Sequence, residues 1–236
     1  MKKKILFLFF LISLSSFSQS VEPSKILIIY FSRTGNTEKF VNYINEISEN
    51  ISKFKIEPAS PYPDDYNTVL NIAQEEQKSN ARPEIKNALN NVNDYDIILL
   101  GYPIWYSHLP NIVINQLEKL DLNGKTIYPF NTHGSSGTGS SINDIKSYAK
   151  NAIVKDGFPI SMNEINDKTS SMNKIKNWLE QIIGEGEDNQ NEEQEDNQKE
   201  EQEDNEKEEQ EENENNKSIY KKINQYLFYI ICILLY

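Results

Sequence analysis

The stretch KILIIYFSRTGNT, from Lys25 to Thr37, decides what fold the rest of the chain is expected to have. Its first part, Ile26–Phe31, is a nearly continuous apolar run, which is typical of a strand buried on both faces of a parallel sheet. The polar segment Ser32–Thr37 follows directly. Beyond it, apolar residues between Phe40 and Ile47 recur at helical spacing. The stretch therefore predicts a buried strand, a tight turn and a helix in succession.

The same alternation continues along the chain to Gly184. Further strands are predicted at Phe54–Pro58, Ile97–Leu100, Thr126–Phe130 and Ala152–Val154. Helices are predicted at Tyr66–Gln77, Pro83–Asn90, from Pro110 onward, at Ile142–Ala149 and at Ile175–Ile182. This order predicts an α/β fold, a three-layer sandwich with a five-stranded parallel sheet and helices on both faces. Ligands of such sheets bind beyond the carboxyl ends of the strands, which directs attention to three loops.

The first loop, Ser32–Thr37, follows a buried strand and opens a helix. Its glycine permits a tight turn, and the positive end of the helix dipole favours an anion, so the loop predicts a phosphate site. The GK[ST] ending of a nucleoside-triphosphate loop is absent, as are the three spaced glycines of a dinucleotide site. A monophosphate held by hydroxyl and amide groups is the expected guest.

The second and third loops complete the predicted site. The second, GYPIWYSHLP at Gly101–Pro110, carries two aromatic residues where they are well placed to cover a flat ring, although one of the two is expected to pack beneath the next helix. His108 is predicted to be structural or solvent-facing rather than catalytic. The third, NTHGSSGTGSS at Asn131–Ser141, has three glycines that let backbone approach a ligand closely; in isolation it could also be a flexible surface loop.

Taken together, Lys25–Thr37, Gly101–Pro110 and Phe130–Ser141 resemble the flavodoxins, and most closely the flavodoxin-like proteins with GYPIW and THGSSGTGSS loops. The resemblance runs roughly from Lys25 to Ile183 and includes Tyr62–Pro83. It implies non-covalent binding of FMN, with the first loop on the phosphate, the second beside the isoalloxazine ring, and the third around the rest of the ring. The implied binding residues are Ser32, Arg33, Thr34, Gly35, Asn36, Thr37, Pro103, Ile104, Trp105, Tyr106, Thr132, His133, Gly134, Ser135, Gly137 and Gly139.

The resemblance implies a monomeric electron carrier that shuttles low-potential electrons between redox partner proteins. Two alternatives stay open: an FMN-dependent NAD(P)H:quinone-type oxidoreductase, and an exported surface interaction protein with a vestigial flavin site. Because the flavin supplies the chemistry, no side chain is needed as an acid or base, and neither a catalytic residue nor a metal ligand is predicted. His108 and His133 are accordingly not interpreted as a catalytic pair.

Charge is spread unevenly over the 236 residues. The chain has 24 basic and 36 acidic residues, a net charge of −12, but the segment from Glu185 to Glu214 alone contributes −15. The remainder lacks the basic footprint that binding to nucleic acid requires. A single cysteine excludes an intrachain disulfide and any metal site with several cysteine ligands.

Both ends carry segments unlike the middle. Residues 1–20 have three lysines, an apolar run and a small polar stretch, which predicts a signal peptide and export to the periplasm or cell surface; the alternative is an uncleaved anchor with the domain on the cytoplasmic face. A flavodoxin-like domain is expected at 21–184. Residues 185–217 hold an eight-residue acidic repeat without apolar residues, predicted to be disordered. Residues 218–236 form a short hydrophobic segment with the potential for membrane association.

Overall fold

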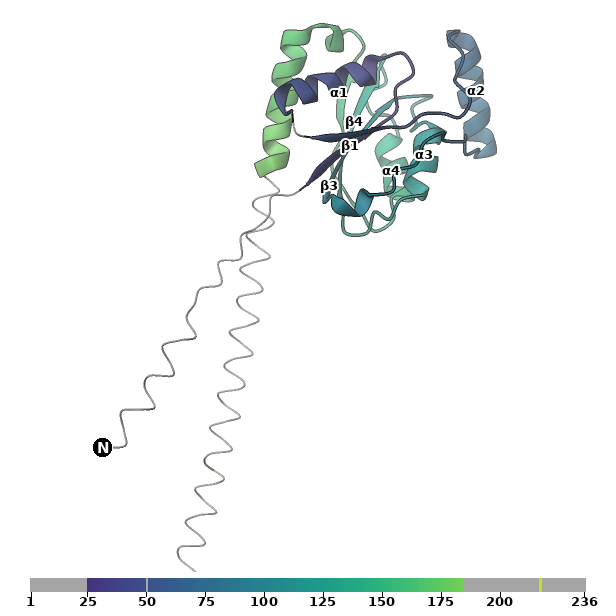
Figure 1. Ribbon diagram of the computed structural model, residues 1–236. Coiled ribbons are helices and arrows are strands. Elements are labelled where there is room, and N and C mark those ends of the chain that lie inside the picture. Colours follow the sequence, from purple (N-terminus) through teal and green to yellow (C-terminus); the bar gives the residue numbers. More distant parts are fainter. Residues whose placement is uncertain (1–24, 50, 185–216, 218–236) are drawn as a thin grey trace, which may run out of the picture. The chain divides into compact units, whose positions relative to one another are not determined.

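The structure is a computed structural model that describes residues 25–49, 51–184 and 217 (Figure 1). The predicted signal peptide, nearly all of the acidic repeat and the hydrophobic C-terminal segment lie outside the described residues. Within the described part of the chain, no helix combines the length and the apolar character needed to cross a bilayer.

All strand pairs of the central sheet are parallel. The strand order is β2 (Ser52–Lys55), β1 (Ile26–Tyr30), β3 (Ile97–Pro103), β4 (Thr126–His133) and β5 (Ile153–Val154). A sixth strand, β6 (Phe158–Ser161), pairs with the second half of β4, beyond the point where the two-residue β5 ends. The predicted α/β fold is confirmed, with one strand more than expected because two short strands share one edge of β4.

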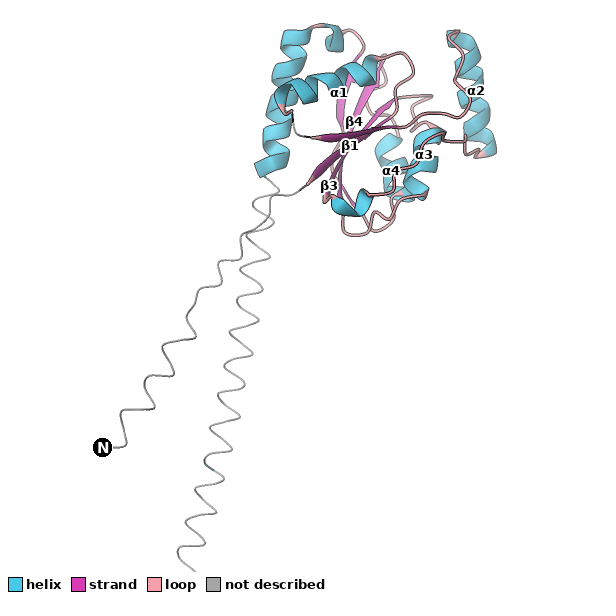
Figure 2. Ribbon diagram, in the orientation of Figure 1, coloured by secondary structure: helices cyan, strands magenta, loops and turns pink. Residues whose placement is uncertain are grey.

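Helices cover both faces of this sheet (Figure 2). Figure 1 shows α1 (Asn36–Ile47) and the helical residues 168–180 on one side, and α3 (Asn111–Glu118) with α4 (Ser141–Tyr148) on the other. On the first side the rings of Phe40 and Phe130 stack with centroids 4.4 Å apart, and Trp178 packs edge-on against both. Fully buried aliphatic side chains of β1, β3 and α3 fill the other side, which fixes the sheet between its two helical layers.

The helix predicted at Pro83–Asn90 is not formed. After α2 (Tyr66–Ser79), this segment runs extended beside residues 57–59: Ile85 pairs with Pro58 in an antiparallel bridge, and the Lys86 N–H donates to Glu57 O at 2.8 Å. The Asn87 side chain adds a bond to Lys55 O at 2.7 Å. The segment therefore supplies hydrogen-bond partners to the backbone that follows edge strand β2. These bonds favour the extended conformation over the helix that the apolar spacing predicts.

Candidate functional site

The three predicted loops meet at the carboxyl edge of the sheet. The hydroxyl groups of Thr37, in the first loop, and Thr132, in the third, lie 2.9 Å apart. The Ile104 N–H of the second loop donates to Thr132 O at 2.9 Å, and the Ser140 N–H donates to Ser107 O at 2.6 Å. Each loop is thus bonded to at least one of the others. The topology of a parallel sheet produces this convergence, because β1, β3 and β4 all end on the same side.

The first loop is shaped as an anion cradle. Gly35 caps α1 in the left-handed conformation, with φ 88°, and the position of an added Cβ would be free of other atoms within 4 Å. In the first turn, the Glu38 N–H donates to Ser32 Oγ and the Lys39 N–H donates to Gly35 O. Because the first amides of a helix have no acceptor within it, the N–H groups of Asn36 and Thr37 are left for a ligand.

Further polar side chains of this loop also have partners within the protein. The Arg33 guanidinium donates to the carbonyl oxygens of Pro63 at 2.9 Å and Asp64 at 3.2 Å, which ties the loop to the segment before α2. The Asn36 amide donates to Thr34 Oγ1 at 3.5 Å. Arg33 therefore ties the loop to the segment before α2, and the Asn36 bond to Thr34 lies within the loop itself.

The second loop closes in a strained two-residue turn. Trp105 and His108 exchange both backbone hydrogen bonds, at 3.1 Å and 2.9 Å, and between them Tyr106 and Ser107 have φ values of 48° and 63°. Positive φ at both central positions suits glycine or asparagine, and neither is present. The loop begins at Pro103, which pairs in register with Thr132. A sparsely populated backbone conformation beside a candidate site indicates that the surrounding contacts hold it in place.

The two aromatic residues of this turn have different environments. The Trp105 ring packs edge-on against Phe31, with centroids 5.5 Å apart, and against Tyr62, at 4.9 Å. The Tyr106 ring is 39 % exposed. Trp105 is therefore the packed member of the pair, supported by two rings rather than by the following helix, and Tyr106 is the one that is free to cover a ligand.

The third loop depends on glycine for its approach to the second. A Cβ at Gly139, where φ is 53°, would overlap the carbonyl group of Ser107. The Asn131 side chain donates to Gly137 O at 3.0 Å, and Gly134 lies beside the Met162 methyl group. Ser135 follows directly on this exposed part of the loop. The loop is therefore bonded to β4 at Gly137, whereas Gly134 and Ser135 are exposed.

Two buried polar atoms under this loop lack a partner among the described residues. They are Asn131 Oδ1 and His133 Nδ1. Both side chains leave β4 on the same face, because they are two residues apart in a strand. A buried polar atom without a hydrogen bond is energetically costly. These two atoms at the base of the loop are therefore suited to hydrogen-bond a polar ligand. The residues present thus suit a phosphate at the first loop and a flat polar ring between the other two.

The titratable groups beside the loops are shifted by packing. Burial, with the negative charge of Glu76, raises the pKa of the Tyr62 phenol, whose hydroxyl donates to both Glu76 oxygens at 3.0 Å and 3.2 Å. Burial also raises the pKa of Tyr30 to about 12, with Glu38 adding to the shift. Phenols with raised pKa values stay neutral at physiological pH. These groups serve as packed hydrogen-bond donors to Glu38 and Glu76.

Sequence reasoning missed two residues that hold the second loop. The Gln77 side chain of α2 donates to Trp105 O at 2.9 Å, and Asp144 of α4 accepts from the Leu109 N–H at 3.0 Å. Neither lies in a loop or in a recognisable motif. Their roles follow only from the placement of α2 and α4 behind the second loop.

Comparisons with known proteins identify the family of the chain. A family model described as flavodoxin matches residues 25–182. The chain is 31 % identical to a candidate flavoprotein from Bacteroides eggerthii, covering 68 % of this chain and 98 % of that one with a TM-score of 0.58. It is 25 % identical to a candidate flavoprotein from Bacteroides uniformis, covering 67 % and 99 % with a TM-score of 0.57.

A third solved structure shares the fold and contains a ligand. It is a flavoprotein from Lactobacillus acidophilus in complex with FMN, 22 % identical, covering 62 % of this chain and 99 % of that one with a TM-score of 0.53. No curated protein matches the chain. The family model spans about two thirds of the chain and includes all three converging loops. This chain belongs to the flavodoxin family.

Proposed function

We propose that the chain binds FMN non-covalently and carries electrons between redox partner proteins. One observation supports this above the others. Three loops meet at one edge of the sheet, where Gly35 caps the N-terminus of α1 in the left-handed conformation. The FMN complex of the similar Lactobacillus acidophilus flavoprotein supports the choice of ligand. When bound, FMN supplies one- and two-electron transfer, which the protein itself need not catalyse.

Different residues of the chain bind the phosphate and the ring of FMN. The N–H groups of Asn36 and Thr37 and the Thr34 hydroxyl hold the phosphate, and the Gly35 backbone admits it without a clash. Trp105, fixed by Phe31 and Tyr62, borders the ring, and the exposed Tyr106 covers it. Asn131 and His133, below the third loop, offer hydrogen bonds to the polar edge of the ring.

A two-electron reductase acting on quinone-type acceptors with NAD(P)H is the second candidate. The same loops would serve it, because the flavin supplies the chemistry in both cases. Both candidates require FMN binding, and the course of flavin reduction separates them.

We further propose that the protein works outside the cytoplasm, attached to a membrane. The lysines, apolar run and small polar stretch of residues 1–20 support export, and the hydrophobic residues 218–236 support attachment to a membrane. Fractionation of cells that express the chain, followed by sequencing of its N-terminus, tests both points. An intact Met1 in the cytoplasmic fraction would contradict them.

The decisive experiment is an anaerobic reductive titration of the full chain with FMN, followed by visible absorbance. Accumulation of a one-electron-reduced form between the oxidised and fully reduced forms would favour the carrier. Direct conversion to the fully reduced form, together with turnover of NAD(P)H and a quinone, would favour the reductase. Absence of FMN binding would overturn both and would direct attention to the acidic repeat.

A further inference from the structure

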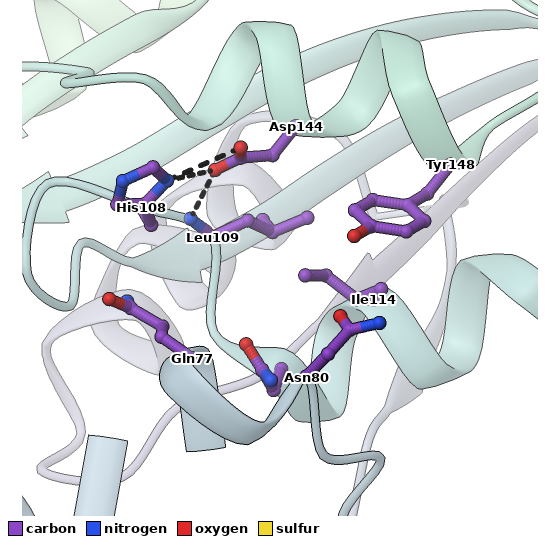
Figure 3. A pocket seen from close by; sticks show the side chains of 8 residues that line it. Gln77, Asn80, His108, Leu109, Ile114, Asp144 and Tyr148 are labelled. Atoms are coloured by element: carbon purple, nitrogen blue, oxygen red, sulfur yellow. Dashed lines mark hydrogen bonds and ion pairs between the residues drawn. The ribbon is translucent and has the colours of Figure 1, made fainter. Parts of the chain in front are cut away.

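The turn Trp105–His108 is held from behind by α4. Asp144 Oδ2 accepts from the Leu109 N–H at 3.0 Å and lies 3.0 Å from His108 Nδ1, and Asp144 Oδ1 lies 3.3 Å from the same nitrogen (Figure 3). A single carboxylate therefore contacts two consecutive residues where the turn rejoins the fold. Its side chain is 19 % exposed, against 45 % for His108. The carboxylate is the fixed member of this contact, and the imidazole is the member that it restrains.

Side-chain packing around His108 does not by itself hold the turn in place. A cavity of about 280 Å³ lies behind the turn, bordered by Gln77, His108 and Asp144 among other residues, and Figure 3 shows their side chains around an open centre. Leu109, the next residue, is fully buried. The chain is thus anchored by apolar contact at Leu109, but His108 faces a space into which its side chain could swing. Without the carboxylate, only the Gln77 bond to Trp105 O and backbone bonds would keep the turn closed on this side.

The turn needs restraint because its backbone is unfavourable. Tyr106 and Ser107 both have positive φ, a conformation that is unfavourable for residues with a side chain. The other contacts that oppose this strain are the Gln77 bond to Trp105 O and the Ser140 bond to Ser107 O. Asp144 is the only one of these that is charged, and hydrogen bonds to an ionised acceptor are stronger than neutral ones.

We infer that Asp144 is a positioning residue for the flavin site: acting through His108 and Leu109, it keeps the strained turn Trp105–His108 in the conformation that borders the ring. This inference rests on the proposed binding of FMN. Asp144 itself belongs to α4 and acts only through the turn.

The test compares FMN affinity across a graded series of variants of the full chain, measured by quenching of flavin fluorescence. Asp144→Ala removes both contacts and should weaken FMN binding about tenfold. Asp144→Asn keeps an oxygen for the Leu109 N–H but loses the charge facing His108, so its affinity should fall in between. The matched control is Asp94→Ala, which removes the same charge from an exposed site before β3 and should bind FMN as the unaltered protein does.

A second measurement separates positioning from general destabilisation. Ser107→Gly relaxes one of the two strained residues, so the same Asp144→Ala change should cost less than about threefold in a Ser107→Gly background. The visible circular dichroism of bound FMN should change in Asp144→Ala and return toward that of the unaltered protein in the double variant. A general loss of stability would produce neither the coupling nor the spectral recovery.

The outcomes are distinguishable. Failure of the unaltered chain to bind FMN would overturn the proposed function itself. Binding by the unaltered chain, with Asp144→Ala and Asp144→Asn both within about twofold of it, would overturn the positioning role alone. Equal losses for Asp144→Ala with and without Ser107→Gly would also overturn it, because strain in the turn would then have no part in the effect.

Discussion

The hydroxyl groups of Thr37 and Thr132 lie 2.9 Å apart, and the two side chains are only 1 % and 3 % exposed. This bond joins the first turn of α1 to the end of β4, two segments that are 95 residues apart in the chain. It connects the candidate phosphate cradle to the base of the third loop. Because both groups are buried, each depends on the other for a partner.

Removal of one hydroxyl from this pair should therefore destabilise the domain. Thr132→Val leaves the Thr37 hydroxyl buried without its partner, which should lower the free energy of unfolding by about 1–3 kcal/mol. The double variant Thr37→Val/Thr132→Val removes both groups and should cost less than the sum of the single changes. Urea unfolding of the four proteins without FMN measures this coupling, and strictly additive effects would contradict the pairing.

Gly35→Asp should abolish tight FMN binding. The left-handed backbone at Gly35 disfavours any side chain, and the carboxylate would repel a phosphate at the same helix terminus. The matched control is Gly124→Asp, since Gly124 also has a positive φ, 71°, and free space at the Cβ position, but precedes β4 at the other edge of the sheet. Both variants should lose stability, but only Gly35→Asp should lose FMN affinity. Similar FMN affinities of the two variants would show that this loop does not bind the phosphate.

Replacement of Tyr106 should affect FMN affinity alone, whereas replacement of Trp105 should affect both affinity and stability. Tyr106→Ala removes an exposed ring and should weaken FMN binding by about 1–3 kcal/mol, by analogy with base stacking, while leaving unfolding of the FMN-free protein almost unchanged. Trp105→Ala also removes the contacts with Phe31 and Tyr62, so it should reduce both affinity and stability. Titration with FMN and thermal unfolding, performed on both variants, separate these roles. A large loss of stability in Tyr106→Ala would show that the ring is packed in solution.

Glu164 should contribute stability that is lost in acid. A hydrogen bond from Lys174 and then the Ser161 N–H lower its pKa from 4.5 to about 2. A carboxyl whose pKa is lower in the folded state stabilises above its unfolded pKa and loses that contribution as the pH falls through the folded value. Since the group is half exposed, Glu164→Gln should cost no more than about 1 kcal/mol at pH 7. The difference from the unaltered protein should shrink between pH 4.5 and 2 in urea unfolding, and a difference that grows in acid would contradict the assignment.

Truncation after Gly184 should leave FMN binding intact. All the loops of the site precede this residue, and the acidic repeat that follows contains no apolar residue to pack on the domain. A chain from Val21 to Gly184 should therefore bind FMN with the affinity of the full chain, measured by fluorescence titration. Loss of binding by a truncated protein that is still folded would assign a segment outside Val21–Gly184 a part in the site.

The sequence by itself determined the alternation of elements and the identity of the three loops. Buried strands such as Ile26–Tyr30 and Ile97–Pro103 have nearly continuous apolar runs, and local periodicity is enough to predict them. Because parallel strands end at one edge, the loops that follow them could also be placed together. The doubly wound fold and the candidate site were therefore predictable from local patterns combined with one rule of topology.

Only the tertiary structure decided how those loops are held and which neighbours they have. Ile85 and Leu89 have helical spacing, but their segment is extended because the chain after β2 needs hydrogen-bond partners. The β6 strand exists because β5 ends after two residues and leaves the edge of β4 open. Asp144 reaches the turn at His108 from 36 residues away. Such pairings depend on contacts between distant segments, which local propensity does not encode.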